Sequence, residues 1–255
     1  MVATCYLLGV STRRVKKLAQ SLGVTQLSKS QVSEMAKTLD ERVAEFRNRP
    51  LDGSPYTFVW IDALMQRVRE GGRVVNIACL VAVRVNAEGH REILGVDLTT
   101  TENGSGWVAF LRSLVARGLS GVQLVVSETH GGLVDAIGAL DEKFPKAAEH
   151  LEAARDDLLA FAAYPREVWR QIWSNNPQER LNKEIRRRTD VVGIFPDRDA
   201  IIRLVGAVLA EQSDEWTEQR RYIGAEILER CRKIGTAHTI EGNQGPETTL
   251  VRLAA

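Results

Sequence analysis

The first fifty residues carry apolar side chains at helical spacing. Between Ser11 and Gly23, apolar residues recur every three to four positions until the glycine ends the pattern. Ser28 and Gln31 then form a capping-box pattern that opens a second helix. Its apolar face consists of Val32, Met35, Ala36, Leu39 and Val43. The pattern predicts two helices joined by a short turn.

This helical pair has two interpretations. It is either an ordinary αα-hairpin, because amphipathic helices around a glycine are common, or a DNA-binding helix-turn-helix. In the second case Lys29, Ser30 and Gln31 would point from the second helix towards the major groove of DNA.

After a linker at 50–55, the apolar pattern changes to that of strands. Residues 56–62, 74–85 and 91–98 read as three strands, with a hairpin turn at 86–89 between the last two. The elements expected next are a helix at 107–117, a buried strand at 122–126 and a helix at 132–140. The order β-β-β-α-β-α predicts an α/β fold.

Helical patterns dominate the second half of the chain. Residues 144–172 read as helical, and helices continue from Asn176, broken at 189–196, until a polar tail begins. The abrupt start, with helix-interior residues and no capping residue, predicts a truncated N-terminus. The domains expected are a helical segment at 1–50, an α/β core with C-terminal helices at 51–234 and a disordered tail at 235–255.

Composition narrows the class of protein. With 255 residues and 44% hydrophobic side chains, the chain can form one substantial core. No apolar run approaches the roughly 20 residues of a membrane-spanning helix, and the N-terminal basic residues follow the apolar stretch, which is wrong for a signal peptide. We therefore expect a cytoplasmic protein. Three widely spaced cysteines favour neither a disulfide framework nor a zinc site.

Charge is unevenly placed, although the net charge is only +1. Residues 1–50 hold nine Lys/Arg and four Asp/Glu. A second basic cluster, offset only by Glu184, consists of Arg180, Lys183, Arg186, Arg187 and Arg188. Two basic patches on a nearly neutral protein favour local phosphate contacts over a uniform nucleic-acid coat.

Three acids stand at the ends of predicted elements. Asp62 closes the first strand, Glu128 closes the fourth, and Glu179 opens a later helix. If these two strands are neighbours, Asp62 and Glu128 lie side by side at one edge of the sheet. Carboxylate oxygens in such a cluster suit Mg²⁺ or Mn²⁺, and a two-metal site can support phosphodiester displacement. The acids therefore indicate phosphoryl transfer on DNA.

Each acid also has a purely structural explanation. Asp62 and Glu128 fit turn residues at strand ends. Asn176-Pro-Gln-Glu179 fits an N-cap, a proline at N1 and a capping-box glutamate at N3, which would serve only the helix start. Against this, Lys183 and Arg186 share the helix face of Glu179, as expected for a metal ligand flanked by phosphate contacts.

The most distinctive stretch runs from Ile172 through Asn176-Pro-Gln-Glu-Arg-Leu-Asn-Lys-Glu to Phe195-Pro196. Together with shorter blocks such as Gly9–Arg14 and Leu27–Ser33, it resembles the bacterial insertion-sequence transposases of the mutator family. The resemblance covers nearly everything from Tyr6 to about Arg232.

The resemblance implies a ribonuclease H-like catalytic core with a DDE acid triad. Trp60-Ile-Asp62-Ala matches the first aspartate, Ser127-Glu128-Thr-His matches the second, and Glu179 matches the glutamate. It further implies Mg²⁺ or Mn²⁺, phosphate contacts by Lys183, Arg186 and Arg187, and a homo-oligomer acting on the terminal inverted repeats and target DNA in the nucleoid.

The sequence differs from the family pattern in three ways, and these differences leave more than one possible function. The second acid is Glu128 where the family has aspartate, no Cys-x-x-His motif follows it, and the family's region upstream of Tyr6 is absent. The chain is then either a transposase that cleaves and transfers DNA strands or an inactive remnant that binds DNA or full-length subunits. A third interpretation is a DNA-binding regulator that depends on the helical pair at 11–47.

Overall fold

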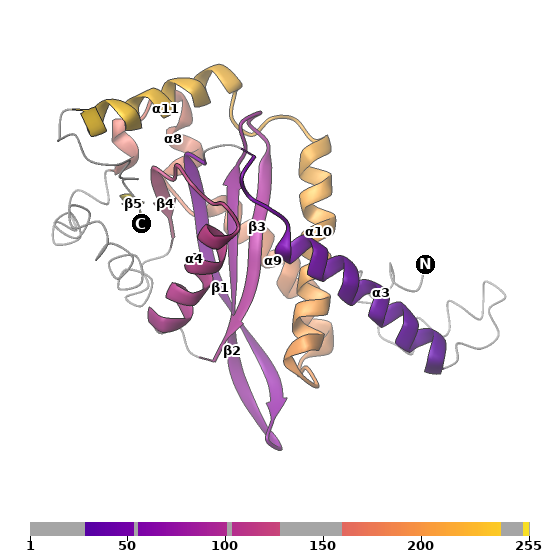
Figure 1. Cartoon of the computed structure of the whole chain (residues 1–255). Helices are drawn as coiled ribbons and strands as arrows, with labels where there is room; N and C mark the ends of the chain where they lie inside the picture. The colour runs from indigo at the N-terminus through magenta and orange to yellow at the C-terminus, as the bar shows by residue number, and fades with distance from the viewer. Residues whose placement is uncertain (1–28, 54–55, 101–103, 128–159, 241–251, 255) are drawn as a thin grey trace.

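The computed structural model describes residues 29–53, 56–100, 104–127, 160–240 and 252–254. They form a mixed α/β structure in which one sheet lies between α4 on one face and a group of later helices on the other (Figure 1). The helices are α3 (Lys29–Asn48), α4 (Gly104–Ala116), α8 (Arg166–Ile172), α9 (Asn176–Val192), α10 (Arg198–Glu218) and α11 (Ala225–Ile240), with a 3₁₀ helix η1 at Ala160–Ala163.

The sheet has the strand order β3-β2-β1-β4-β5. Its strands are β1 (Phe58–Glu70), β2 (Arg73–Val85), β3 (Arg91–Thr99), β4 (Leu124–Val126) and β5 (Arg252–Ala254). Strands β1, β2 and β3 are antiparallel, whereas β4 runs parallel to β1 and β5 runs parallel to β4. The predicted order of the first four strands and of α4 is confirmed.

Two hairpins build the antiparallel half of the sheet. The turn predicted at 86–89 is confirmed, because the Asn86 N–H donates to the His90 carbonyl at 2.8 Å. The other turn consists of Gly71 and Gly72, with φ of 55° and 76°, a left-handed conformation that glycine adopts without strain. It joins two strands of 13 residues, so β1 continues well past Asp62, where the sequence had suggested its end.

One face of the sheet packs against α4. Alternate residues of β1, including Val59 and Ile61, point to this side and meet Trp107, Phe110 and Leu114 of the helix. Gly118 follows α4 with φ 103° and ends it at the predicted glycine.

The other face packs against α8, α9, α10 and α11. Phe58, Trp60 and Leu64 of β1 belong to the same core as Leu181 of α9 and Leu204 of α10. This core is the larger of the two that flank the sheet. It also covers the strand positions next to Asp62, which shares the side of β1 occupied by Trp60 and Leu64.

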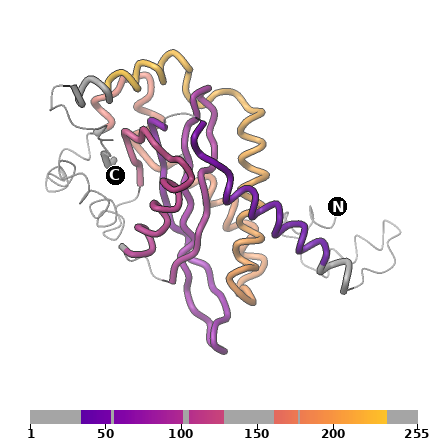
Figure 2. Tube along the Cα trace, in the orientation of Figure 1, coloured from indigo at the N-terminus to yellow at the C-terminus, as the bar shows by residue number. Residues whose placement is uncertain are grey.

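Helix α3 confirms the second helix predicted in the N-terminal segment, and it docks on α10. Its predicted face supplies Leu39 and Val43, which pack against Ala207. Gly206 lets the helices approach, since a Cβ there would meet Val43 Cγ1 at 2.5 Å. Figure 2 shows α3 crossing α10 at the edge of the sheet. The first helix of the predicted pair, at 11–23, lies outside the described residues.

Later element boundaries differ from those expected. Helix α9 continues to Val192 through the predicted break, which shrinks to the short stretch before α10. Helix α11 runs past Gly235 to Ile240, and Arg252–Ala254 forms β5. The helix predicted at 132–140 lies outside the described ranges. None of the helices that the structure describes is long and apolar enough to span a bilayer.

Candidate active site

Asp62 is a buried carboxylate in the middle of β1, with only 7% of its surface exposed. The prediction that it closes the strand is wrong, because the β1–β2 hairpin carries β1 on to Glu70. Its Oδ1 accepts a hydrogen bond from the Ala63 N–H at 2.8 Å, and its Oδ2 accepts one from Asn182 Nδ2 of α9. A turn role for Asp62 is thereby excluded.

Helix α9 crosses the sheet at this carboxylate. Gln178 is fully buried, and its Nε2 lies 3.5 Å from the carbonyl oxygen of Val81, the β2 residue paired with Asp62. One turn further along, Asn182 reaches Asp62 itself. The first turns of α9 therefore lie directly over the centre of the sheet.

Glu179 stands on the same helix, beside the Asp62 contact. The N-cap of α9 is Asn175, one residue earlier than predicted, so Glu179 occupies the fourth helical position instead of the capping-box third. No side-chain cap bond forms, and the Glu179 N–H donates to the Asn175 carbonyl at 3.0 Å. The side chain of Glu179 is exposed. The capping explanation for this acid is wrong.

The amides around Asp62 have unused hydrogen-bonding capacity. Because a carboxylate only accepts, Asn182 must present Nδ2 to Asp62, which leaves its Oδ1 facing elsewhere. Among the described residues, this buried Oδ1 has no hydrogen-bond partner, and neither do Gln178 Oε1 and both side-chain polar atoms of Asn175. Buried polar atoms are normally satisfied, so these exceptions make the surroundings of Asp62 a candidate binding site.

Sequence reasoning missed these amides. Asn175, Gln178 and Asn182 recur at helical spacing along the same stripe as the buried Leu181 and Ile185. The sequence offered one signal for them: these residues are polar, although the helical periodicity assigns their positions to the core.

Glu128 lies outside the described residues. Strand β4 pairs in parallel with β1, with Trp60 opposite Val126, and the buried Ser127 follows β4. The condition set in the sequence analysis, that the first and fourth strands are neighbours, is met. Within the part of the chain that the structure describes, no three His, Cys, Asp or Glu side chains are grouped closely enough to hold a metal ion.

The predicted phosphate-binding residues of α9 are not equivalent. Lys183 and Arg186 are exposed like Glu179, whose helix face they were predicted to share, while Leu181 and Ile185 are buried. Arg187 is also exposed, but its guanidinium binds Glu184 at 2.8 Å. Hydrogen bonds from Arg187 and Arg188 lower the pKa of Glu184. Lys183 and Arg186 are thus the better candidates for an external phosphate.

The predicted DNA-reading residues lie at the start of α3. Lys29, Ser30 and Gln31 belong to its first turn, but their side chains are not among those described. The docking contacts of α3 fall in its second half, where Leu39 and Val43 pack and Asp40 pairs with Arg203.

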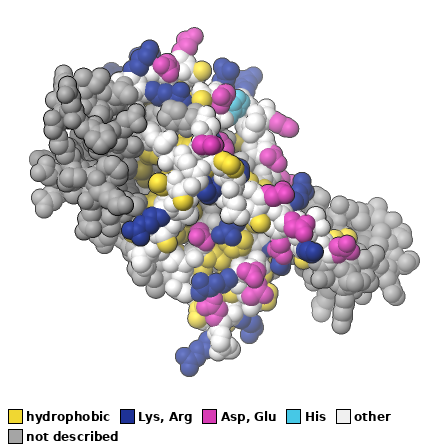
Figure 3. Space-filling model, viewed as in Figure 1, with side chains coloured by type: hydrophobic (Ala, Val, Ile, Leu, Met, Phe, Trp, Pro, Cys, Tyr) yellow, Lys and Arg dark blue, Asp and Glu magenta, His cyan; other side chains and the backbone are white. Residues whose placement is uncertain are grey.

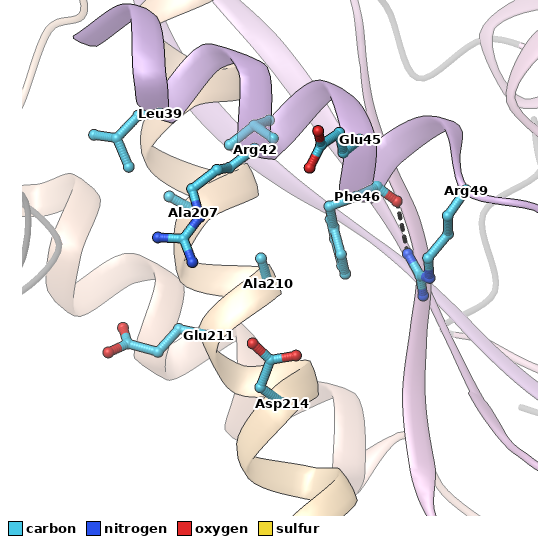
Figure 4. A pocket seen from close by; sticks show the side chains of 10 residues that line it. Leu39, Arg42, Glu45, Phe46, Arg49, Ala207, Ala210, Glu211 and Asp214 are labelled. Carbon is cyan, nitrogen blue, oxygen red and sulfur yellow. Dashed lines mark hydrogen bonds between the residues drawn. The ribbon is translucent and has the colours of Figure 1, made fainter. Parts of the chain in front are cut away.

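A cavity of about 550 Å³ lies between α3 and α10 (Figure 4), and neither Asp62 nor Glu179 lines it. Arg42 of α3 reaches across it towards α10, where Glu211 and Asp214 line the other side. Arg49 at its end donates to the Phe46 carbonyl at 2.7 Å. Acids and arginines alternate in this lining, which gives no consistent pattern for a phosphate-rich ligand.

The described cysteines are unsuited to nucleophilic chemistry. Burial raises the pKa of the Cys79 thiol to about 12 and that of Cys231 to about 11. At neutral pH both are protonated, and the thiolate is the reactive form. The acids remain the chemically competent groups.

Comparison with known proteins gives the family of the chain. The family described as "Transposase, Mutator family" matches residues 1–143 and 138–219. The chain belongs to this family. The Mutator-family resemblance inferred from the sequence blocks is confirmed.

Several curated transposases match over most of the chain. The transposase for insertion sequence element IS1081 of Mycobacterium tuberculosis is 56% identical over 293 residues, covering 93% of this chain and 71% of the relative. That for ISRM5 of Rhizobium meliloti is 34% identical, covering 91% and 72%. That for IS256 in transposon Tn4001 of Staphylococcus aureus is 30% identical, covering 86% and 71%.

The match to the Mutator family is interrupted. Its two matched segments meet at residues 138–143. The alignment with the Mycobacterium tuberculosis transposase spans 293 positions, more than the 255 residues of this chain, so the relative has internal residues that this chain lacks. The interruption falls after β4 and Glu128 and before α9.

Proposed function

We propose that this Mutator-family protein acts as a transposase, cleaving and transferring DNA strands at the ends of an insertion element. One observation carries the proposal: the buried carboxylate of Asp62 is held by Asn182, on the helix that presents Glu179 one turn earlier. Asp62 and Asn182 are 120 residues apart in sequence. Helix α9, which carries Glu179, thus packs on β1 at Asp62, and β4 runs parallel to β1 as far as Trp60.

The core is proposed to be ribonuclease H-like. Support comes from the sheet order β3-β2-β1-β4-β5, with three antiparallel strands followed by a parallel β4. In such a sheet, side chains at paired positions of two adjacent strands lie side by side on the same face. Glu128 is proposed as the third acid, because it directly follows Ser127, and the register beyond Trp60 and Val126 leads to Asp62 on one strand and to position 128 on the other.

Asp62, Glu128 and Glu179 are proposed to hold Mg²⁺ or Mn²⁺. The donor set suits these ions, since carboxylate and amide oxygens are hard ligands and the buried Asn182 Oδ1 is an acceptor without a partner. Bound divalent ions supply charge stabilisation for the attacking and leaving oxygens of a phosphodiester displacement.

The other residues of the site are proposed to orient the acids and to bind DNA. Asn182 fixes the orientation of Asp62 through a neutral amide, which leaves the negative charge of the carboxylate available. Lys183 and Arg186, exposed beside Glu179, are proposed to contact DNA phosphates, with Arg187 contributing through its exposed part. Lys29, Ser30 and Gln31 are proposed to contact the inverted repeats from α3, as in a helix-turn-helix, in an oligomer that pairs the two ends.

A nicking and strand-transfer assay tests the proposal. Duplexes carrying the ends of the element are incubated with Mg²⁺ or Mn²⁺ and the parent chain, Asp62→Asn or Glu128→Asp. We expect cleavage by the parent, a loss of at least about a hundredfold in Asp62→Asn, and a gain in Glu128→Asp, because misplacing a catalytic group by about 1 Å can cost roughly that factor. Equal cleavage by Asp62→Asn and the parent would contradict the assignment.

A second candidate function is a remnant that binds DNA or full-length transposase subunits without catalysis. The interrupted family match favours it, together with Glu128 in place of aspartate. If none of the three proteins cleaves DNA while the parent still binds an end duplex, this second function holds.

A further inference from the structure

The distal half of the β1–β2 hairpin projects beyond the helices as a two-stranded ribbon (Figures 1 and 2). Strand β4 pairs with β1 only as far as Trp60, so it does not accompany this part of β1. Main-chain hydrogen bonds with Phe195 support the ribbon instead: the Arg69 N–H donates to the Phe195 carbonyl at 2.9 Å, and the Phe195 N–H donates to the Arg67 carbonyl at 2.8 Å.

The two faces of the ribbon differ. On one, Leu64, Gln66 and Val68 are buried; on the other, Met65, Arg67 and Arg69 are exposed. In the antiparallel register, Arg67 is opposite Asn76 and Arg69 is opposite Val74, which places these partners on the same exposed face. The residues of this outer face are Met65, Arg67, Arg69, Val74 and Asn76.

The outer face combines positive charge with exposed apolar surface. Met65 is 51% exposed and Val74 is 47% exposed. Arg67, Arg69 and the nearby Arg73 form no ion pair with other described residues. The acid at the tip, Glu70, is already bound by Arg198 at 3.2 Å. In Figure 3, lysine and arginine side chains stand at this end of the molecule.

We propose that the outer face of this ribbon binds duplex DNA. The major groove admits a two-stranded β-ribbon, arginine and asparagine are the side chains that pair with guanine and adenine edges there, and apolar side chains contact the thymine methyl group. The positive charge complements the phosphates, and the two exposed apolar residues would be covered in the groove. The inference rests on the proposed action on DNA.

The ribbon would contact the DNA at some distance from the bond that is cleaved. Arg67 follows Asp62 by five residues, about 17 Å along a strand at about 3.3 Å per residue. At about 3.4 Å of axial rise per base pair, that distance corresponds to roughly five base pairs. The ribbon is therefore a positioning contact on flanking duplex, outside the acid site.

Fluorescence anisotropy with a short labelled duplex, measured between about 50 and 200 mM salt, tests the proposal. The double variant Arg67→Ala, Arg69→Ala should bind at least roughly tenfold more weakly, with a salt slope smaller by up to about 1.8, the value reached when both arginines contact phosphates. The matched control is Arg112→Ala, Arg170→Ala, which removes the same charge from exposed sites on α4 and α8. Circular dichroism checks that both variants are folded.

The outcomes separate this inference from the proposed function. Asp62→Asn should bind the duplex like the parent while failing to cleave it. If the ribbon variant binds as tightly as the control, the inference is wrong while the acid site stands. If the ribbon variant leaves DNA binding unchanged but converts an oligomer to monomers in sedimentation, the outer face is a protein interface and the inference is likewise overturned.

Discussion

The two faces of the sheet are built from the same strands but differ in what they bury. Behind α4, the centre of the core is apolar, formed by residues such as Ile61, Leu80 and Phe110. Beneath α9, the core is interrupted by Asp62, Gln178 and Asn182. Within the described ranges, each face has a tryptophan whose indole N–H lacks a partner. The α4 side also buries Arg84, which donates to Glu92 and lies over the Tyr56 ring, so the contrast is in the carboxylate and the amides beneath α9.

That difference marks the α9 face as the one with a candidate functional site. Burying a carboxylate and incompletely bonded amides costs free energy that an apolar core would not. Such groups persist where chemistry requires them, which is why local violations of packing rules tend to mark functional sites. Both faces are therefore expected to contribute to stability, and the α9 face is the one for which we propose metal binding and cleavage.

The largest expected loss of stability is for a substitution on the α4 face. Phe110→Ala should lower the free energy of unfolding by about 3 to 5 kcal/mol, because it empties a buried ring site. Urea denaturation followed by circular dichroism measures this. Val115→Ala on the same helix is the control, since Val115 is 57% exposed and should change stability by less than about 0.5 kcal/mol. If the two substitutions lowered the free energy of unfolding equally, the burial of Phe110 would not contribute to stability as proposed.

A smaller change in stability distinguishes two amides on the α9 face. Asn182→Leu should cost about 1 to 3 kcal/mol by leaving Asp62 Oδ2 without this donor. Gln178→Leu should cost less, because the hydrogen bond it removes, from Nε2 to the Val81 carbonyl, is long at 3.5 Å and involves no charged group. Asn182→Leu should also weaken Mn²⁺ binding by roughly 10- to 100-fold in calorimetry, as loss of a positioning partner does. If both variants bind Mn²⁺ like the parent, Asn182 has only a structural role.

The smallest expected effect is on the pH dependence of stability, through Glu184. The folded-state pKa of Glu184 is lowered from its ordinary value of 4.5, so its stabilising contribution is present above that value and is lost as the pH falls through the lowered pKa. Glu184→Gln should therefore reduce stability near neutral pH by less than about 1 kcal/mol and flatten the acid-side decline. Thermal unfolding measured from neutral pH downwards would reveal it. A steeper decline in the variant would contradict this assignment.

Local patterns predicted much of the fold. Alternation and turn residues located β2, β3 and the Asn86 hairpin, and helical periodicity located α3, α4 and α9. The length of β1 was missed because the Gly71-Gly72 turn was not read as a hairpin. The N-cap of α9 was misplaced by one residue because Asn175 and Asn176 are equally good caps in sequence.

The sequence by itself determined the family, and it singled out two acids on elements that the structure packs together, Asp62 on β1 and Glu179 on α9. It also determined which faces of α3 and α9 are apolar, because that depends only on residue spacing. Tertiary structure alone decided that Asp62 lies within a strand, that Asn182 holds it, and that one face of the hairpin stays uncovered. These contacts join residues 120 positions apart or depend on where a neighbouring strand stops, and neither is encoded in any local pattern.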